Sequence, residues 1–246
     1  TIVDADMDPY AAPAMFERML QATRYSNNEQ IPEFLRSHPL SENRIADTRN
    51  RARKYPKKVR ESDLEYQLMR ARVITELAAS PAQAVERFRG ELEGASTSPE
   101  AATYGLVLAL TAAGRADEAA LELDSIWSKK PERLEYIIAD AEIEMVRNRS
   151  AEAANKLRRR LDVSPGNHPL TMAYATALMK NQQPHIAEEV LVAQSKRRPN
   201  DPGLWYLLAE VQGLAGDILG LHQSRAEYFI LNGDLEQARK QLTYAL

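Results

Sequence analysis

Apolar residues recur at helical spacing from Ser62 to the end of the chain, and the helices that they predict come in pairs. The expected pairs are 62–78 with 81–93, 99–113 with 116–129, 133–147 with 150–163, and 167–181 with 184–197. Three consecutive helices follow at 202–215, 217–231 and 234–246. In the first pair, one apolar face is marked by Tyr66, Met69, Val73 and Leu77, and the other by Val85, Phe88 and Leu92. The pattern predicts an all-α chain of antiparallel helices.

The first 60 residues have a different pattern. Met15, Phe16, Met19 and Leu20 predict one helical face, with Asp8 as its N-cap and Pro9 at the first helical position. Residues 24–40 are polar and punctuated by prolines, and 41–55 read as a second helix with Ile45 as its only strong apolar anchor. We therefore expect a short helical segment at 1–60, followed by a repeat domain at 61–246.

One spacing organises the repeat domain. Pro131, Pro165 and Pro199 lie 34 residues apart, and 17 residues before each comes a polar corner that begins at Gly114, Asn148 and Gln182. This period is typical of tetratricopeptide (TPR) repeats. A single helix pair cannot bury its apolar face, so the pairs stack into a superhelix with an extended concave surface. The sequence thus predicts a TPR-type solenoid that serves as a binding scaffold, with its last helix capping the stack.

Two carboxylates interrupt the apolar pattern. Asp140 and Glu144 occupy positions where this repeat type places core residues. Either the helix is rotated there, or the carboxylates face solvent or a partner. Burial without a partner would cost several kcal/mol, which favours solvent or pairing.

The concave face of such a solenoid carries residues five, nine and twelve of the first helix in each pair. These positions are Tyr104, Leu108, Thr111, Ile138, Glu142, Met145, Met172, Thr176, Met179, Tyr206 and Glu210. Methionine-rich surfaces adapt to varied apolar partners, so we expect a groove that binds proteins. The alternative is that some of these residues are buried between helices.

Composition narrows the function further. A net charge of −3 argues against a nucleic-acid binder driven by a positive field, and no apolar run approaches the length of a membrane span. The absence of cysteine rules out disulfides and thiolate zinc sites. None of the four histidines, His38, His168, His185 and His222, has the spacing of helical zinc ligands, and we expect structural or surface roles for them. No motif supports an enzyme in its own right.

The segment before the repeats carries a family resemblance. A helix that follows Asp8-Pro9 leads to a His38-Pro39 loop, and then to an arginine-rich helix that contains Arg44. This order, followed by TPR repeats and the ending Gly233–Ala238, resembles the C-terminal part of gluzincin metalloproteases of the β-barrel assembly-enhancing protease type. Residues 1–60 would then be the end of a peptidase domain, and the chain looks like a piece of a longer protein.

The resemblance implies a periplasmic zinc endopeptidase and chaperone-like factor for outer-membrane proteins. By position, His38 is similar to the loop histidine that approaches the active-site zinc and keeps such enzymes latent, and Arg44 to the arginine beside the active site. The zinc-binding helix would lie upstream, so we expect no catalytic zinc and no peptidase activity in this chain alone.

The implied partners are the β-barrel assembly machinery, unfolded or stalled outer-membrane proteins and the chain's own peptidase domain. The alternative is a free-standing TPR adaptor in the cytoplasm. An H-E-x-x-H motif upstream of Thr1 would favour the protease, and a start codon just before Thr1 without an export signal would favour the adaptor.

Overall fold

A computed structural model of the chain describes residues 2–25, 42–57, 63–94, 98–128 and 131–245. These residues form thirteen α-helices and no strand, so the predicted all-α class is confirmed. The chain divides into two compact units, Thr1–Ser62 and Asp63–Leu246. The division predicted from the sequence, between residues 60 and 61, lies two residues earlier.

The first unit holds two helices, α1 (Ala11–Tyr25) and α2 (Glu42–Ala52), which pack on each other. Ile45 is buried, as its role of apolar anchor predicts. Asp8 accepts a hydrogen bond from the Tyr10 amide at 3.1 Å, but α1 begins at Ala11, so Asp8 and Pro9 form a turn before the helix rather than its cap. Met15 and Met19 are each 45% exposed, so the predicted apolar face of α1 is only partly covered.

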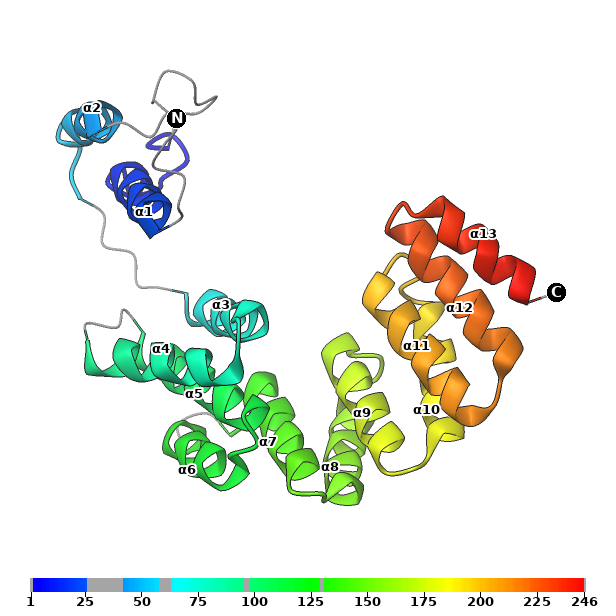
Figure 1. Ribbon diagram of the computed structural model, residues 1–246. Helices are drawn as coiled ribbons and strands as arrows, with labels where there is room; N and C mark the ends of the chain where they lie inside the picture. Colours follow the sequence, from blue (N-terminus) through cyan, green and yellow to red (C-terminus); the bar gives the residue numbers. More distant parts are fainter. Residues whose placement is uncertain (1, 26–41, 58–62, 95–97, 129–130, 246) are drawn as a thin grey trace. The chain divides into compact units, whose positions relative to one another are not determined.

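The second unit is a row of eleven described helices, which Figure 1 shows as successive hairpins from cyan to red. Their bounds are α3 (Leu64–Leu77), α4 (Pro81–Glu93), α5 (Pro99–Ala112), α6 (Ala116–Trp127), α7 (Leu134–Val146), α8 (Ser150–Val163), α9 (His168–Lys180), α10 (Pro184–Ser195), α11 (Pro202–Ala215), α12 (Ile218–Leu231) and α13 (Leu235–Tyr244). Every end lies within two residues of its predicted position. The predicted TPR-type solenoid is therefore confirmed for this unit.

The 34-residue period is present in the backbone conformation of the corners. Gly114, Asn148, Gln182 and Gly216 are spaced 34 residues apart, and all have positive φ, at 75°, 60°, 58° and 81°. At each corner the next amide donates to a carbonyl five residues earlier, as Arg115 does to Leu110 at 2.9 Å. This bond and the left-handed residue before it form a Schellman cap, which ends the first helix of the pair and turns the chain into the second.

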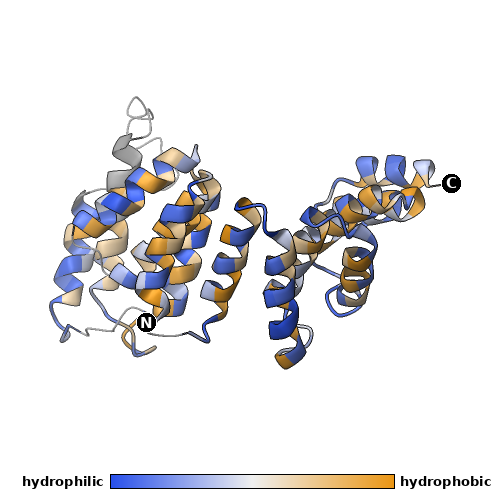
Figure 2. Cartoon of the chain, turned by 90° about the horizontal axis from the view of Figure 1, so that it is seen from below, coloured by the Kyte–Doolittle hydropathy of each residue, from blue (hydrophilic) through white to orange (hydrophobic). Residues whose placement is uncertain are grey.

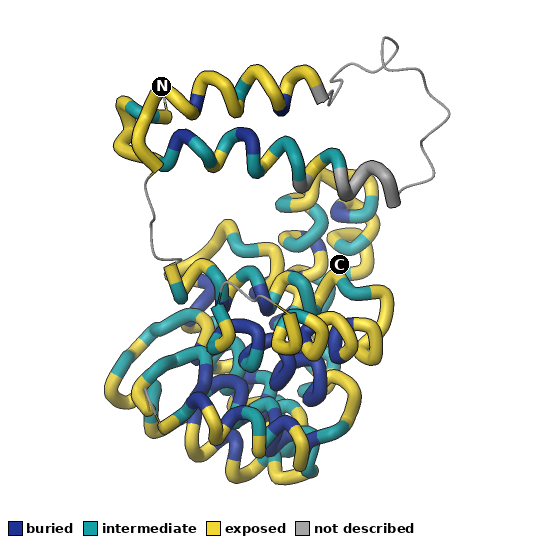
Figure 3. Tube along the Cα trace, turned by 90° about the vertical axis from the view of Figure 1, so that its left-hand side faces the viewer, coloured by how far each residue is buried: buried dark blue, intermediate teal, exposed yellow. Residues whose placement is uncertain are grey.

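The core of the second unit consists of two apolar clusters that meet at α7. Figure 3 shows the buried positions on the inside of the stack and the exposed ones at the corners, and Figure 2 shows apolar and polar residues on different faces of the helices. Helix α7 contributes Tyr136, Ala139 and Ile143 to the first cluster, and Ile138, Ala141 and Met145 to the second. Because α7 belongs to both clusters, it couples the two halves of the stack.

Close helix packing explains one glycine. A Cβ atom at Gly105 of α5 would lie 2.3 Å from the ring of Phe88 on α4, closer than real Cβ atoms approach. Phe88 itself is fully buried, as predicted, and so is Val85. Leu92, the third residue assigned to that face, is 37% exposed and lies at its edge.

The prediction of which face of α3 is buried is wrong. Tyr66, Met69, Val73 and Leu77 are 63%, 42%, 51% and 80% exposed, whereas Leu68 and Ala71 are buried. Helix α3 packs mainly on α5 and has no helix pair before it in the second unit. The residues of α5 that lie 36 positions after Tyr66, Met69 and Val73 are buried, and α5 packs against α3, α4, α6 and α7. The apolar pattern is present in both helices, but a neighbour decides which side becomes core.

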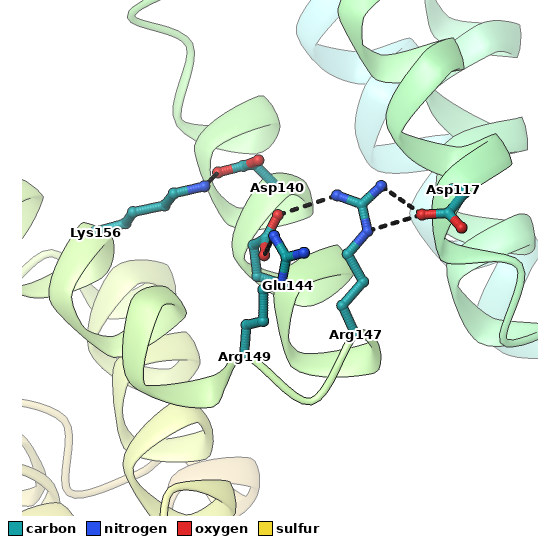
Figure 4. A network of polar contacts seen from close by, with 6 residues as sticks. All are labelled: Asp117, Asp140, Glu144, Arg147, Arg149 and Lys156. Carbon is teal, nitrogen blue, oxygen red and sulfur yellow. Dashed lines mark hydrogen bonds and ion pairs between the residues drawn. The ribbon is translucent and has the colours of Figure 1, made fainter.

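The two carboxylates of α7 are paired (Figure 4). Glu144 is 5% exposed, and its Oε1 accepts a hydrogen bond from Arg147 at 3.1 Å, while Oε2 lies 3.6 Å from Arg149. Arg147 also binds Asp117 of α6, at 2.7 Å. Asp140 lies 2.6 Å from Lys156 of α8. Of the alternatives left open by the sequence, pairing with cations is the one observed.

Candidate functional site: a hollow along the first helices

A hollow of about 320 Å³ lies between the C-terminal halves of α3, α5, α7 and α9, the first helices of four successive pairs. Five of the predicted groove residues line it, namely Leu108, Thr111, Glu142, Met145 and Thr176. Arg72, Thr75 and Glu76 of α3 and Lys180 of α9 also line it. The hollow is formed by residues from four helices, so it exists only in the stacked solenoid.

The lining of the hollow is largely apolar. Leu108 and Met145 are 6% and 7% exposed and belong to the two core clusters. The hydroxyls of Thr75, Thr111 and Thr176 each donate to the carbonyl four residues earlier in their own helix, at 2.8–3.0 Å. Because these hydroxyl protons are used within the helices, the threonines offer a ligand no donors. The surface suits an apolar group.

A charged cluster forms one wall of the hollow. Arg72 Nη1 lies 3.0 Å from Glu142 Oε1, and Arg72 Nη2 lies 2.8 Å from the hydroxyl of Tyr104. Burial lowers the pKa of Arg72, but Glu142 and Tyr104 together outweigh it and raise the pKa above its ordinary value. Burial also raises the pKa of Tyr104 to about 12, against the opposing effect of Arg72. At neutral pH the cluster is thus an ion pair with a neutral phenol beneath it.

Sequence reasoning missed Arg72 and Thr75. The rule of positions five, nine and twelve, counted from Leu64 at the start of α3, would have pointed to Leu68, Arg72 and Thr75. Leu68 is buried, as Tyr104 and Ile138 are at the same position of α5 and α7. The predicted groove positions begin with the second pair, so these residues of the first pair are not among them.

The remaining predicted groove residues lie outside the hollow. Tyr104 is fully buried and Ile138 is 8% exposed, so both serve the core rather than an open surface, as the alternative interpretation had it. Met172 and Met179 are half-buried against the second core cluster. Tyr206 is 52% exposed, and a hydrogen bond from its hydroxyl to Glu210 raises its pKa. Tyr206 also packs on Tyr228, with ring centroids 5.5 Å apart.

Opposite charges lie at the two sides of the hollow. Glu76 on α3 and Lys180 on α9 are both exposed, and neither has an ion pair among the described residues. Helices α5 and α7 lie between α3 and α9 in the stack, since α3 packs on α5, α5 on α7, and α7 on α9. The two charges therefore flank the hollow from opposite sides.

The histidines that the structure describes have structural or surface positions. His168 begins α9 and joins three helices, because its Nε2 lies 3.1 Å from Asp201 and its Nδ1 3.3 Å from Gln194. It therefore links α9 to α10 and to the residue that caps α11. His222 lies 2.8 Å from Gln241, and His185 is exposed. Among the described residues no group of three His, Cys, Asp or Glu is placed to hold a metal ion.

The two family-derived residues lie in the first unit. His38 lies outside the described residues. Arg44 of α2 is exposed and its guanidinium lies over the ring of Phe16 of α1, 5.7 Å from the centroid. This contact joins the two helices of the unit and does not by itself test a role at an active site. None of the described helices is long and apolar enough to cross a membrane.

Comparison with known proteins supports the resemblance. The chain is 30% identical to the beta-barrel assembly-enhancing protease of Escherichia coli K12 over 97% of its own length, and 29% identical to that of Yersinia pestis over 94%. It is 30% identical to the putative beta-barrel assembly-enhancing protease of Vibrio cholerae over its whole length. The chain covers 48%, 47% and 51% of these relatives, so it spans about half of their length.

Comparisons with family models and with solved structures add no information on function. No family model matches the chain. A crystal structure of a tetratricopeptide repeat protein from Parabacteroides merdae aligns with a TM-score of 0.47 at 14% identity, over 82% of this chain and 84% of the other. The chain is therefore related to other proteins by its sequence. Nearly the whole chain is similar to about half the length of each protein named a beta-barrel assembly-enhancing protease.

Proposed function

We propose that this chain is the recognition arm of a β-barrel assembly-enhancing protease and binds polypeptides in the groove along α3, α5, α7 and α9. The observation that carries the proposal is the similarity over 94–100% of the chain to proteases of that name. The hollow supplies the physical counterpart, because an apolar surface of this size on a repeat scaffold suits an exposed apolar segment of another protein.

In this proposal the peptidase chemistry belongs to another part of the protein. The zinc ligands lie in the portion that precedes residue 1, residues 1–60 complete the peptidase domain, and His38 and Arg44 lie close to its active site. The partners are the β-barrel assembly machinery and unfolded or stalled outer-membrane proteins, and the compartment is the periplasm. The TPR unit holds the substrate or the machinery while the peptidase domain acts.

A photo-crosslinking experiment in the full-length protein tests the groove. A crosslinker at Thr176, which lines the hollow, is expected to capture unfolded outer-membrane proteins or the assembly machinery. The matched control is the same crosslinker at Leu121 of α6, which is 72% exposed and does not line the hollow. In a second variant the crosslinker stands at Thr75, which also lines the hollow. Adding the substitution Thr176→Arg to that variant should abolish its adducts. Equal capture from Leu121 and Thr176 would contradict the proposal.

The link to the peptidase is tested separately. The full-length protein should bind zinc and cleave an unfolded outer-membrane protein, whereas the 246-residue chain should do neither. Peptidase activity of the isolated chain would contradict the proposal, because the proposal places the zinc ligands outside this chain.

A further inference from the structure

The charged side chains around the hollow differ in whether they already have an ion-pair partner within the protein. The Arg72 guanidinium is engaged by Glu142 and by the Tyr104 hydroxyl, so this ion pair is neutral as a unit. Glu76 and Lys180 are exposed and have no ion pair among the described residues. A ligand in the hollow therefore meets, within the described part of the chain, an unpaired carboxylate on the α3 side and an unpaired ammonium group on the α9 side. The apolar part of the lining lies between them.

The size of the hollow limits its occupant. About 320 Å³ is at the lower end of the volumes of small-molecule pockets, roughly 300–1,000 Å³, and it accommodates one large side chain. A helix, whose diameter with side chains is about 10–12 Å, can also insert one side chain, but its neighbours on that face lie only about 5–6 Å away. An extended segment fits better, because its alternate side chains point to the same face about 7 Å apart. One apolar side chain can then enter while the residues two before and two after it reach toward α3 and α9.

We propose that the hollow binds an extended polypeptide through one large apolar residue that has a cationic residue on one side and an acidic residue on the other, each two positions away. The cation lies near Glu76 and the carboxylate near Lys180. Because the peptide can enter in either direction, the order of the two charges along its sequence is free, and only their opposite sign is required. This inference rests on the proposed function and adds to it a rule for which segments bind.

Three peptides that differ only in the flanking charges test the rule. Their cores are Lys-Ser-Phe-Ser-Glu, Lys-Ser-Phe-Ser-Lys and Glu-Ser-Phe-Ser-Glu, blocked at both ends and titrated into the 246-residue chain. We expect the mixed-charge peptide to bind about tenfold more tightly than either like-charged peptide at low ionic strength, since each exposed contact contributes only modestly. The preference should shrink as salt screens the charges.

Charge reversal at each side supplies the matched variants. Glu76→Lys should shift the preference to the peptide with two glutamates, and Lys180→Glu to the peptide with two lysines. Both residues are exposed, so the variants should fold, which circular dichroism checks. Replacing Phe by Ser in the mixed-charge peptide should abolish binding in every case.

The outcomes separate this inference from the proposed function. Equal binding of the three peptides, or a preference that the two variants leave unchanged, overturns the charge rule while the groove remains a binding site. A lack of binding by all three peptides, together with no groove-specific crosslinks from Thr176, overturns both.

Discussion

Arg72 of α3 and Glu142 of α7 meet at 3.0 Å across the helix that lies between them, although 70 positions separate them in the sequence. The Tyr104 hydroxyl of that middle helix, α5, lies 2.8 Å from the same guanidinium. Three first helices of successive pairs are thus joined at one point, at the wall of the hollow. The cluster therefore links α3, α5 and α7, and its Arg72 and Glu142 line the candidate site.

Removing the cation of this cluster should destabilise the fold. Arg72→Met leaves Glu142 and the buried Tyr104 without their shared partner, and we expect a loss of about 1.5–3 kcal/mol in the free energy of unfolding. Urea denaturation followed by circular dichroism measures it. Arg72→Lys keeps the charge but cannot bind both partners with a planar fork, so it should recover only part of the loss. A full recovery by lysine would show that charge alone matters.

The left-handed corners give a prediction about backbone strain. Gly114 has φ of 75°, and a Cβ atom added there would have no neighbouring atom within 4 Å, so Gly114→Ala should cost about 1 kcal/mol through conformation alone. Gln182 occupies the equivalent corner with φ of 58°. Gln182→Gly should therefore stabilise the protein, by about 0.5–1 kcal/mol. Thermal unfolding of both variants checks the opposite signs, and a loss of stability in Gln182→Gly would contradict the argument.

The buried Glu144 should respond asymmetrically to mutation. Arg147→Ala leaves the buried carboxylate with only the more distant Arg149, and we expect a cost of about 2–4 kcal/mol. Glu144→Leu instead places an apolar residue where this repeat type expects one, and Arg147 keeps Asp117. That variant should lie within about 1 kcal/mol of the parent or be more stable. Chemical denaturation of the two variants compares them, and a greater loss in Glu144→Leu would show that the pair itself is net stabilising.

His168 should make stability depend on pH. Burial lowers its pKa below 6.5, an effect that the nearby Asp201 opposes and Arg198 reinforces. The unfolded chain, with an ordinary histidine, then binds more protons than the folded chain between the two pKa values, so this contribution to stability is present above pH 6.5 and is lost as pH falls below it.

Unfolding experiments between about pH 7.5 and about pH 5 test this dependence. We expect the parent to lose stability toward the acid end more steeply than His168→Gln, which has no titrating group at that position. The same carboxylates are present in both proteins, so the difference arises at His168 and its contact with Asp201. Parallel curves would contradict the role assigned to its burial.

The helix boundaries were predictable because their determinants are local. Asp63, Ser80, Ser98, Asn167 and Asp201 each cap the helix that follows with a side-chain oxygen. The first helices of the later pairs end at corners whose left-handed residue recurs every 34 positions. Caps and corners depend on a few neighbouring residues, so they can be read before any tertiary contact is known.

The candidate site was predictable only in part. The five, nine and twelve rule identified Leu108, Thr111, Glu142, Met145 and Thr176, all of which line the hollow, but it placed Tyr104 and Ile138 in the same groove, although both are buried. Arg72, Glu76 and Lys180 were not identified. Their role in the candidate site depends on whether each charge forms an ion pair within the protein. That in turn depends on residues many positions away in the sequence.

The sequence by itself determined the class of fold, the period and the ends of the helices, because helix propensity, capping and apolar periodicity act over a few residues. Only the tertiary structure decided which face of α3 is covered, how Glu144 is paired and which residues form the hollow. Those outcomes depend on which helices become neighbours, and the free energy of burying or pairing a side chain is set by what lies against it.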